Sequence, residues 1–248
     1  MKLTAALSRF MEFCYPGACG SCKAGIEGTA ALCTACDAEL SKLESAPACR
    51  SCAKPLAEHG APCPWCLGDG MPHYEWVLRL GVFSDPLKHL VHQMKYHGRW
   101  PLAELLADRL ADQERVKGLL TETQVIVPVP LHRLRQVVRG YNQAEVVAKR
   151  LAKRCRIPIA RPVGRLRNTD SQTNMTSVAQ REENMRDAFA LADPRGLRGK
   201  HVVVVDDVMT TGATLRAFAR ALAPAKPASL CAVVIAVADP KGRDFKAV

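Results

Sequence analysis

The stretch from His201 to Leu215 constrains the fold of this 248-residue chain more than any other segment. Its four consecutive valines, Val202 to Val205, are typical of a strand that is buried on both faces, as in a parallel sheet. Two aspartates, a threonine-rich turn and apolar residues at helical spacing come next. A strand, a short turn and a helix in this order predict an anion site, because the first N–H groups of a helix lack partners and lie at its positive end.

The residues after the valines define the ligand further. Asp206 and Asp207 are acceptors that would repel a phosphate placed on them, so they favour hydroxyl groups or a metal ion. The turn offers hydroxyl donors and a glycine that lets the backbone come close; it consists of Thr210, Thr211, Gly212, Ala213 and Thr214. A ribose 5-phosphate meets both demands, since it carries a phosphate at one end and a vicinal diol nearby. The alternative, an ordinary strand that ends in two solvated aspartates, leaves the threonines unexplained.

The net charge of +11 is unevenly distributed along the chain. Residues 1–70 hold six basic and seven acidic side chains, so residues 71–248 carry +12. Eleven basic residues and one acid, Glu145, lie between Arg133 and Arg167. A polyphosphate or a nucleic acid is the natural partner of such a cluster, although a basic, solvated helix face is a common alternative.

The eleven cysteines indicate metal binding in a reducing compartment. No apolar run approaches the ~18–20 residues that span a bilayer, and the N-terminus lacks the long apolar core of a signal peptide. We therefore expect a cytoplasmic protein that does not span the membrane and keeps its thiols reduced. The cysteines then need a function other than disulfide formation.

Eight of the cysteines form four Cys-x2-Cys pairs in two sets. The sets are Cys19, Cys22, Cys33 and Cys36, followed by Cys49, Cys52, Cys63 and Cys66. Four thiolates fill the tetrahedral shell of a structural zinc ion and leave no open position for catalysis. The sequence therefore predicts two structural Zn2+ sites in a tandem zinc ribbon, where metal binding supplies much of the folding. Sequential use of the pairs is our assumption, and crossed use between the two sets stays open.

A cluster of turn residues from Gly68 to Pro72 marks the expected domain boundary. Residues 1–70 would form the double zinc ribbon and residues 71–248 the α/β domain. After the boundary we expect a strand over 75–83, a helix opened by Pro86, a second helix over about 101–116 and a buried strand over 124–130.

The basic residues that follow this strand are expected to face the ligand. Arg133, Arg135 and Arg139 lie in a predicted loop after a strand end, which in an open α/β sheet is the side where ligands bind. Asn142 then begins a helix and forms a capping box with Glu145.

Two cysteines of the α/β domain are expected in the core. Cys155 continues the apolar stripe Ala144, Val147 and Leu151, so it is expected to be buried rather than to act as a nucleophile. Cys231, inside a strand over 229–238, is expected to be buried too.

The stretch from Val202 to Leu215 resembles the signature of the type I phosphoribosyltransferases. In those enzymes the two acidic residues hold the ribose 2- and 3-hydroxyls of phosphoribosyl pyrophosphate, and the threonine-rich turn binds its 5-phosphate. The resemblance implies these roles for Asp206 and Asp207 and for the turn over 210–214. It also implies the type I phosphoribosyltransferase fold, an α/β architecture with a mostly parallel sheet flanked by helices, here preceded by a small zinc-ribbon domain.

A wider set of motifs is similar to the ComF family, also named for GntX. The set comprises the tandem zinc ribbon, Lys95-Tyr96, a Pro-x-Pro-Leu-His segment, Arg139 to Gln143, Gln172-Thr173, Arg181, Asn184 and the phosphoribosyl signature. The similarity covers essentially the whole chain. Members of the family are implied in natural transformation, where they help incoming single-stranded DNA across or away from the inner membrane. Competence and DNA-uptake proteins are therefore implied as partners.

Three functions are compatible with these features. In the first, a phosphoribosyltransferase, Mg2+ bridges the diol and the pyrophosphate, and Asp206, Asp207 and Arg139 are the catalytic residues. Arg133, Arg135 or Arg139 contacts the pyrophosphate, and the 168–177 loop closes to exclude water. In the second, a single-stranded DNA-binding module, the basic helix over 142–156 supplies charge and Tyr96 and Tyr141 stack on bases. The third, a regulator that senses a ribose phosphate, is not distinguished by sequence.

Overall fold

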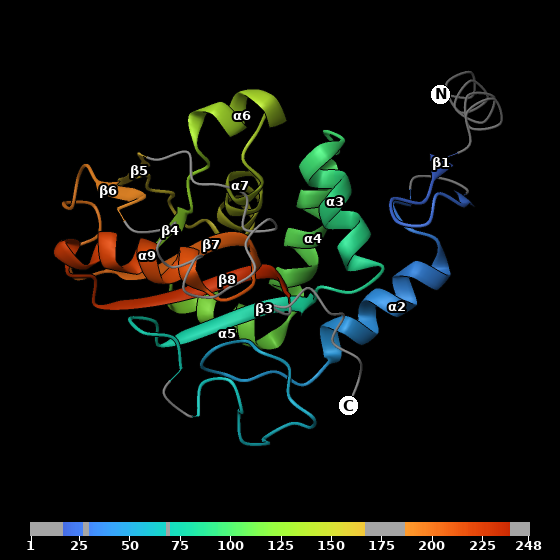
Figure 1. Ribbon diagram of the computed structural model, residues 1–248, viewed down its shortest axis with the longest axis horizontal. Helices are drawn as coiled ribbons and strands as arrows, with labels where there is room; N and C mark the ends of the chain where they lie inside the picture. The colour runs from blue at the N-terminus through green and yellow to red at the C-terminus, as the bar shows by residue number, and fades with distance from the viewer. Residues whose placement is uncertain (1–16, 27–29, 68–69, 167–186, 239–248) are drawn as a thin grey trace.

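The computed structural model describes residues 17–26, 30–67, 70–166 and 187–238 (Figure 1). The 168–177 segment, which was expected to close over the ligand, and the motif residues Gln172, Thr173, Arg181 and Asn184 lie outside the described residues.

A four-stranded parallel sheet forms the centre of the molecule. Its order is β3 (Trp76–Val82), β8 (Ser229–Val237), β7 (His201–Met209) and β4 (Val125–Pro128). Strand β7 pairs in parallel with β8 on one side and with β4 on the other. Because β7 has neighbours on both edges and helices on both faces, Val202 to Val205 are almost fully buried. The predicted α/β fold with a mostly parallel sheet is confirmed.

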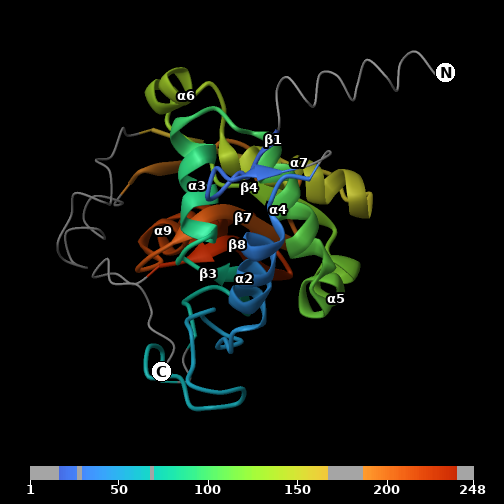
Figure 2. The same cartoon turned by 90° about the vertical axis from the view of Figure 1, so that its right-hand side faces the viewer.

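Helices cover both faces of the sheet, as Figures 1 and 2 show. One face packs against α3 (Leu87–Tyr96), α4 (Pro101–Asp112) and α7 (Gln143–Cys155). The other face packs against α9 (Ala213–Leu222), which continues into the 3-10 turn η2 (Ala223–Ala225). Along β7, Val203 and Val205 belong to the first core and Val202 and Val204 to the second, as expected for side chains that alternate across a strand.

Two further strands form a small sheet beside α9. Strand β5 (Val163–Arg165) pairs antiparallel with β6 (Phe189–Leu191). Phe189 packs edge-to-face on Phe218 of α9, with ring centroids 5.1 Å apart. This contact places Arg165, the last residue of β5, near the end of the central sheet that carries the acid pair.

The predicted second helix over 101–116 is in fact two helices. Helix α4 ends at Asp112 and α5 (Glu114–Glu122) begins after Gln113, whose backbone is extended (φ −68°, ψ 129°). The side chain of Gln113 donates to the Leu80 carbonyl at 2.9 Å, which anchors this break to β3. A helical apolar pattern continues on both sides of Gln113, so the break was not visible in the sequence.

The predicted arginine loop is also partly helical. Residues Arg133–Arg139 form α6, which ends at Gly140 in the left-handed region (φ 78°). None of its seven residues is buried, and it stands away from the sheet in both views (Figures 1 and 2). A short helix with no buried face leaves no apolar periodicity in the sequence.

Helix α7 begins as predicted but differs at two positions. The Asn142 side chain caps it by accepting from the Ala144 N–H at 3.1 Å. Glu145 does not complete a capping box, since its carboxylate accepts from Arg161 at 3.0 Å. Cys155 is exposed rather than in the core, because it is the last residue of α7 and lies beyond Asp112, the last residue of α4. Cys231 is buried as expected.

The cysteine-rich segment lies along β3 and α4. Its first half contains β1 (Gly17–Ala18), β2 (Gly25–Ile26) and α2 (Thr34–Ser45), and Cys19 and Leu40 join the core between the sheet and α4. Arg109 of α4 binds the Glu44 carboxylate of α2 at 2.5 Å. In its second half, Ala53 joins the core around α9. The division of the chain near residue 70 stays a prediction.

Candidate ligand site and metal centres

The acid pair lies where β7 extends beyond its neighbour β4. Strand β4 ends at Pro128, opposite Val205, whereas β7 continues to Met209 along β8. Asp206 and Asp207 are therefore still in the strand, not after it as the sequence suggested, but one edge of the strand is open at this point. Helix α9, which follows β7, and α7, which follows β4 after α6, cover opposite faces of the sheet, which is the arrangement that creates a ligand crevice in open α/β sheets.

The two aspartates face opposite sides of the sheet. Asp207 lies on the α3 side, where its Oδ2 is 3.1 Å from Nζ of Lys95. Asp206 lies on the α9 side, where its charge acts on the buried hydroxyl of Tyr74 and on Arg165. Burial, and then the charge of Asp207, raises the pKa of Asp206 to about 7. At neutral pH this carboxyl group is therefore ready to release a proton when a ligand or a cation reaches it.

The motif from Arg139 to Gln143 fixes the end of α3 that carries Lys95. The Tyr141 hydroxyl and the Gln143 amide both donate to the Met94 carbonyl. The Asn142 amide donates to the Val129 carbonyl at 2.9 Å, directly after β4. Burial raises the pKa of Tyr141, which is consistent with a structural donor. These bonds hold Lys95 beside Asp207, so the motif positions the site from the side of α3.

The turn after β7 leads directly into the N-terminus of α9. Gly212 adopts the left-handed region (φ 81°) immediately before α9 begins at Ala213. The Thr211 side chain accepts from the Ala213 N–H at 3.3 Å, and the Thr211 carbonyl accepts from Arg216 at 2.9 Å. Met71 packs so closely that a Cβ at Gly212 would lie 2.5 Å from its Cε. The positive φ favours glycine at this position, and any larger residue would also require the end of the Met71 side chain to move.

Two basic residues near the acid pair were not singled out as site residues by sequence. Lys95 belonged only to a family motif, and Arg165 only to the basic cluster. Burial is the largest cause that lowers the pKa of Arg165 to about 10, and the positive charge of Arg135 is the next. The negative charges of Asp206 and Asp207 raise this pKa. Its guanidinium lies 5.5 Å from the Phe189 ring centre. No local pattern marks either residue, because each reaches the site through tertiary packing.

The three arginines predicted to face the ligand lie on or at the end of α6. Arg139 contacts Tyr96 at the end of α3, where its guanidinium carbon is 5.4 Å from the ring centre. The positive charges of Arg135 and Arg139 both lower the pKa of Arg165. Arg133 begins the helix. The positive charges of Arg135 and Arg139 therefore reach Arg165 near the aspartates, whereas none of the contacts within the described part of the chain places Arg133 there.

The structure brings the cysteines together in two sequential sets. Within each set the four sulfurs lie within 4.8 Å of one another; the sets are Cys19, Cys22, Cys33 and Cys36, and Cys49, Cys52, Cys63 and Cys66. Zn–S bonds of about 2.3 Å in a tetrahedron place sulfurs about 3.8 Å apart. The sulfurs of Cys22 and Cys33 lie 3.7 Å apart, those of Cys49 and Cys66 3.8 Å, and those of Cys52 and Cys63 3.6 Å. Both donor sets therefore fit structural zinc, and the crossed arrangement does not occur.

The first metal centre also uses the start of a helix. Cys33 is the N-cap of α2, and its sulfur accepts from the Cys36 N–H at 3.5 Å. The Cys19 sulfur accepts from the Cys33 N–H at 3.4 Å. N–H donors and the positive end of a helix stabilise thiolates, the form that binds zinc.

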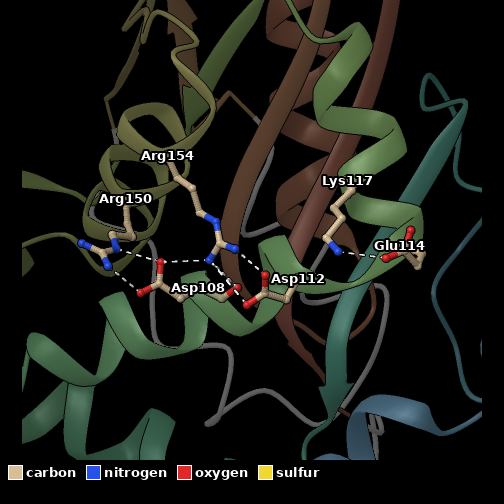
Figure 3. Close-up of polar contacts among 6 residues, drawn as sticks. All are labelled: Asp108, Asp112, Glu114, Lys117, Arg150 and Arg154. Atoms are coloured by element: carbon tan, nitrogen blue, oxygen red, sulfur yellow. Dashed lines mark hydrogen bonds and ion pairs between the residues drawn. The ribbon is translucent and has the colours of Figure 1, made fainter.

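Two arginines of α7 pair with aspartates of α4, as Figure 3 shows. Arg150 binds both carboxylate oxygens of Asp108 on α4, at 2.8 and 2.6 Å. Arg154 binds Asp112, also on α4. Lys149 lies 3.6 Å from Glu145. Arg150 and Arg154 therefore join α7 to α4, and their charges are compensated within the protein.

Fold and cysteine sets together define a class of protein: an α/β domain with a strand–turn–helix unit at the end of β7, attached to two tetracysteine sets that fit zinc. Residues 139–247 match the family described as Phosphoribosyl transferase domain, and residues 10–67 match the one described as Double zinc ribbon domain.

Three relatives identify the family. Competence protein F of Haemophilus influenzae is 32% identical over 197 residues, which cover 77% of this chain and 83% of the relative. DNA utilization protein YhgH of Escherichia coli K12 is 30% identical over 214 residues, 84% of this chain and 91% of the relative. Competence protein ComFC of Bacillus subtilis is 26% identical over 203 residues, 77% of each chain. The chain belongs to the ComF family.

Among the described residues, no helix combines the length and the apolarity that crossing a bilayer demands.

Proposed function

We propose that this protein binds phosphoribosyl pyrophosphate, or a related ribose 5-phosphate, at the end of β7. The observation that carries the proposal is the position of Asp206 and Asp207 at the open edge of β7, three residues before a turn that opens α9 through a left-handed Gly212. The acid pair suits the ribose diol, and the N-terminal amides of α9 suit the 5-phosphate.

The surrounding cations support a ligand with more than one phosphate. Lys95 neutralises Asp207 at 3.1 Å, which lessens repulsion between the acid pair and a phosphorylated ligand. Arg139, Arg135 and Arg133 on α6 are the residues that we assign to the pyrophosphate. If Mg2+ binds with the ligand, it would add charge stabilisation of the departing pyrophosphate. In pentosyl transfer, Asp206 and Asp207 would orient the sugar and the arginines would stabilise the leaving pyrophosphate.

The names of the relatives support a role in DNA use. Two of them are named as competence proteins and one as a DNA utilization protein. We infer that the ribose-phosphate site of this protein serves the uptake or use of DNA, together with competence or DNA-uptake proteins.

Calorimetry with phosphoribosyl pyrophosphate and Mg2+ tests the proposal. The wild type should bind, and the variant with Asp206→Ala and Asp207→Ala should lose binding while it keeps its zinc. Asp193→Ala is a matched control, because Asp193 is an exposed carboxylate that pairs only with its neighbour Arg195 among the ion pairs described. If the wild type gives no binding signal with Mg2+ present, the proposal is wrong.

A second candidate function is the binding of single-stranded DNA. It is favoured by Tyr96, which is 55% exposed and carries Arg139 over its ring, because an exposed aromatic ring with an adjacent cation can stack on a base. Tyr141 is less suited to this role, since its hydroxyl is bonded to Met94. Fluorescence anisotropy with a labelled thymidine oligonucleotide should show binding that weakens with salt and with Tyr96→Ala. The absence of binding at low salt would exclude this function.

A further inference from the structure

One lysine of the second zinc ribbon reaches the turn of the ligand site. Lys54 comes two residues after Cys52 and is only 7% exposed. Its ammonium group donates to the carbonyl of Thr210 at 2.5 Å and to that of Ala238 at 3.3 Å. It also lies 5.6 Å from the ring centre of Trp65, which comes from the same ribbon. A buried cation of the ribbon therefore touches the first residue of the turn and the end of β8.

Neighbouring contacts attach the same ribbon to the same region. The buried guanidinium of Arg79 on β3 donates to the Ala53 carbonyl at 2.9 Å, directly before Lys54. Met71 packs on Gly212 of the turn. The Tyr74 hydroxyl donates to the Leu215 carbonyl in the first turn of α9 at 3.0 Å. The bond from Arg79 therefore fixes the backbone next to Lys54. Met71 packs against the turn from the side on which the second ribbon lies.

The first ribbon shows that Lys54 is not required by the fold of the ribbon itself. The Cys19 N–H donates to the Ala24 carbonyl at 2.8 Å, and in the second ribbon the Cys49 N–H donates to the Lys54 carbonyl at 2.9 Å. The preceding residues, Lys23 and Ala53, have φ values of 68° and 58°. Ala24 therefore takes the same backbone place as Lys54. The ribbon fold therefore does not require a lysine side chain at this place, and the contacts of Lys54 with Thr210 and Ala238 are its distinguishing feature.

We propose that Lys54 is a positioning residue that holds the turn over 210–214 in the conformation that receives an anion, and that it thereby couples the second zinc centre to the ligand site. A carbonyl that is bound to an ammonium group cannot rotate toward an anion, so the Thr210 peptide stays oriented. The nearby positive charge also favours an anion in the turn. Only the identity of this anion rests on the function proposed above, whereas the effect on the turn does not.

Hydrogen exchange of the ligand-free, zinc-loaded full chain tests the effect on the turn. Lys54→Met keeps the apolar stem and removes the charge, and Lys54→Ala reproduces the residue of the first ribbon. In both variants the amides of residues 210–214 should exchange about tenfold faster, the change expected for loss of one charge-assisted hydrogen bond. Zinc content should stay at two per chain. Lys42→Met, which removes an exposed lysine of α2 paired with Glu39, is the control and should change nothing at the turn.

Binding of phosphoribosyl pyrophosphate with Mg2+ is the second measurement. Its dissociation constant should rise about tenfold in Lys54→Met and stay unchanged in Lys42→Met. Unchanged exchange at residues 210–214 in zinc-loaded Lys54→Met overturns the proposal, whatever the binding result. If the wild type does not bind this ligand, the proposed function fails, but the exchange measurement still decides the role of Lys54.

Discussion

The Nζ of Lys95 lies 3.1 Å from Oδ2 of Asp207, and this contact joins the end of α3 to the acid pair of β7. Both side chains are mostly buried, at 20% and 16% exposed. Asp207 follows directly after Asp206, whose pKa is raised by burial and by the charge of Asp207. Lys95 is therefore the cation that makes two adjacent carboxylates tolerable in a partly buried place.

Replacement of Lys95 should destabilise the protein. Lys95→Met leaves the Asp207 carboxylate without its partner, so we expect a loss of about 1–3 kcal/mol in the free energy of unfolding at neutral pH. Urea denaturation measures this loss. Lys117→Met is a matched control: its pair with Glu114 is shorter, at 2.8 Å, but the side chains are 50% and 86% exposed. Because exposed pairs contribute little, equal effects of the two variants would contradict our account of Lys95.

Removal of the Asp206 charge should stabilise the protein and impair ligand binding. The folded pKa of Asp206, about 7, is above the ordinary value of 3.8, so folding is opposed by ionisation of this group at and above neutral pH. Asp206→Asn keeps an acceptor for the Asp207 N–H. It should increase the free energy of unfolding at pH 8 by on the order of 1–3 kcal/mol. The affinity for phosphoribosyl pyrophosphate should fall at least tenfold, because a neutral amide accepts weaker hydrogen bonds from the ribose hydroxyls than a carboxylate does.

The pH dependence of the same variant follows from the sign of the shift. Between the ordinary pKa and the raised one, the folded protein holds more protons than the unfolded protein, so the wild type loses stability as pH rises through this range. The advantage of Asp206→Asn should therefore be full above pH ~7 and shrink as pH falls toward ~4. Thermal unfolding across this range measures it. An advantage that grows toward acid pH would show that the carboxyl group is not protonated in the folded state.

The sequence predicted the parts of the site that are local. Three patterns lie within fifteen residues: a run of valines, an acid pair and a hydroxyl-rich turn before a helix. The valines predict a buried strand, the acid pair its open end, and the turn a helix N-terminus. The fold class followed from the same stretch and from the family motifs. The cysteine pairs predicted zinc, but their equal spacings left the pairing open, and only the folded chain placed Cys19 with Cys33 rather than with Cys49.

Two lysines to which sequence reasoning gave no role in the site act across long distances in the chain. Lys54 binds a carbonyl 156 residues away, and Lys95 binds a carboxylate on β7. Such lysines look like any surface lysine, because burial and partner are set by packing and not by neighbours in sequence. The exposed Cys155 shows the opposite error: a residue in register with an apolar stripe stays exposed when the helix extends past the element that would cover it.

Each metal centre should hold one zinc ion independently of the other. Cys22→Ala removes a ligand of the first set and Cys63→Ala removes one of the second, so each variant should retain about one zinc per chain instead of two. Only Cys63→Ala should markedly weaken binding of phosphoribosyl pyrophosphate, since the second ribbon carries Lys54. Metal analysis and calorimetry on the two variants check this. Equal losses of binding would show that the ribbons stabilise the domain only in a general way.

The ion pairs between α7 and α4 predict which cations contact nucleic acid, if the protein binds it. Arg150 is held by both oxygens of Asp108 (Figure 3), so its charge is already compensated. Arg150→Gln should therefore leave the affinity for single-stranded DNA and its salt dependence nearly unchanged.

The double variant Arg133→Gln with Arg135→Gln removes two cations from α6, where none of the residues is buried. This variant should bind about tenfold more weakly at low salt, with a salt slope reduced by roughly one to two, because each lost phosphate contact removes about 0.7 from the slope for a single strand. Anisotropy titrations at several salt concentrations distinguish the two surfaces. A larger effect of Arg150→Gln would place the nucleic acid on α7 and contradict the neutralisation of that helix by α4.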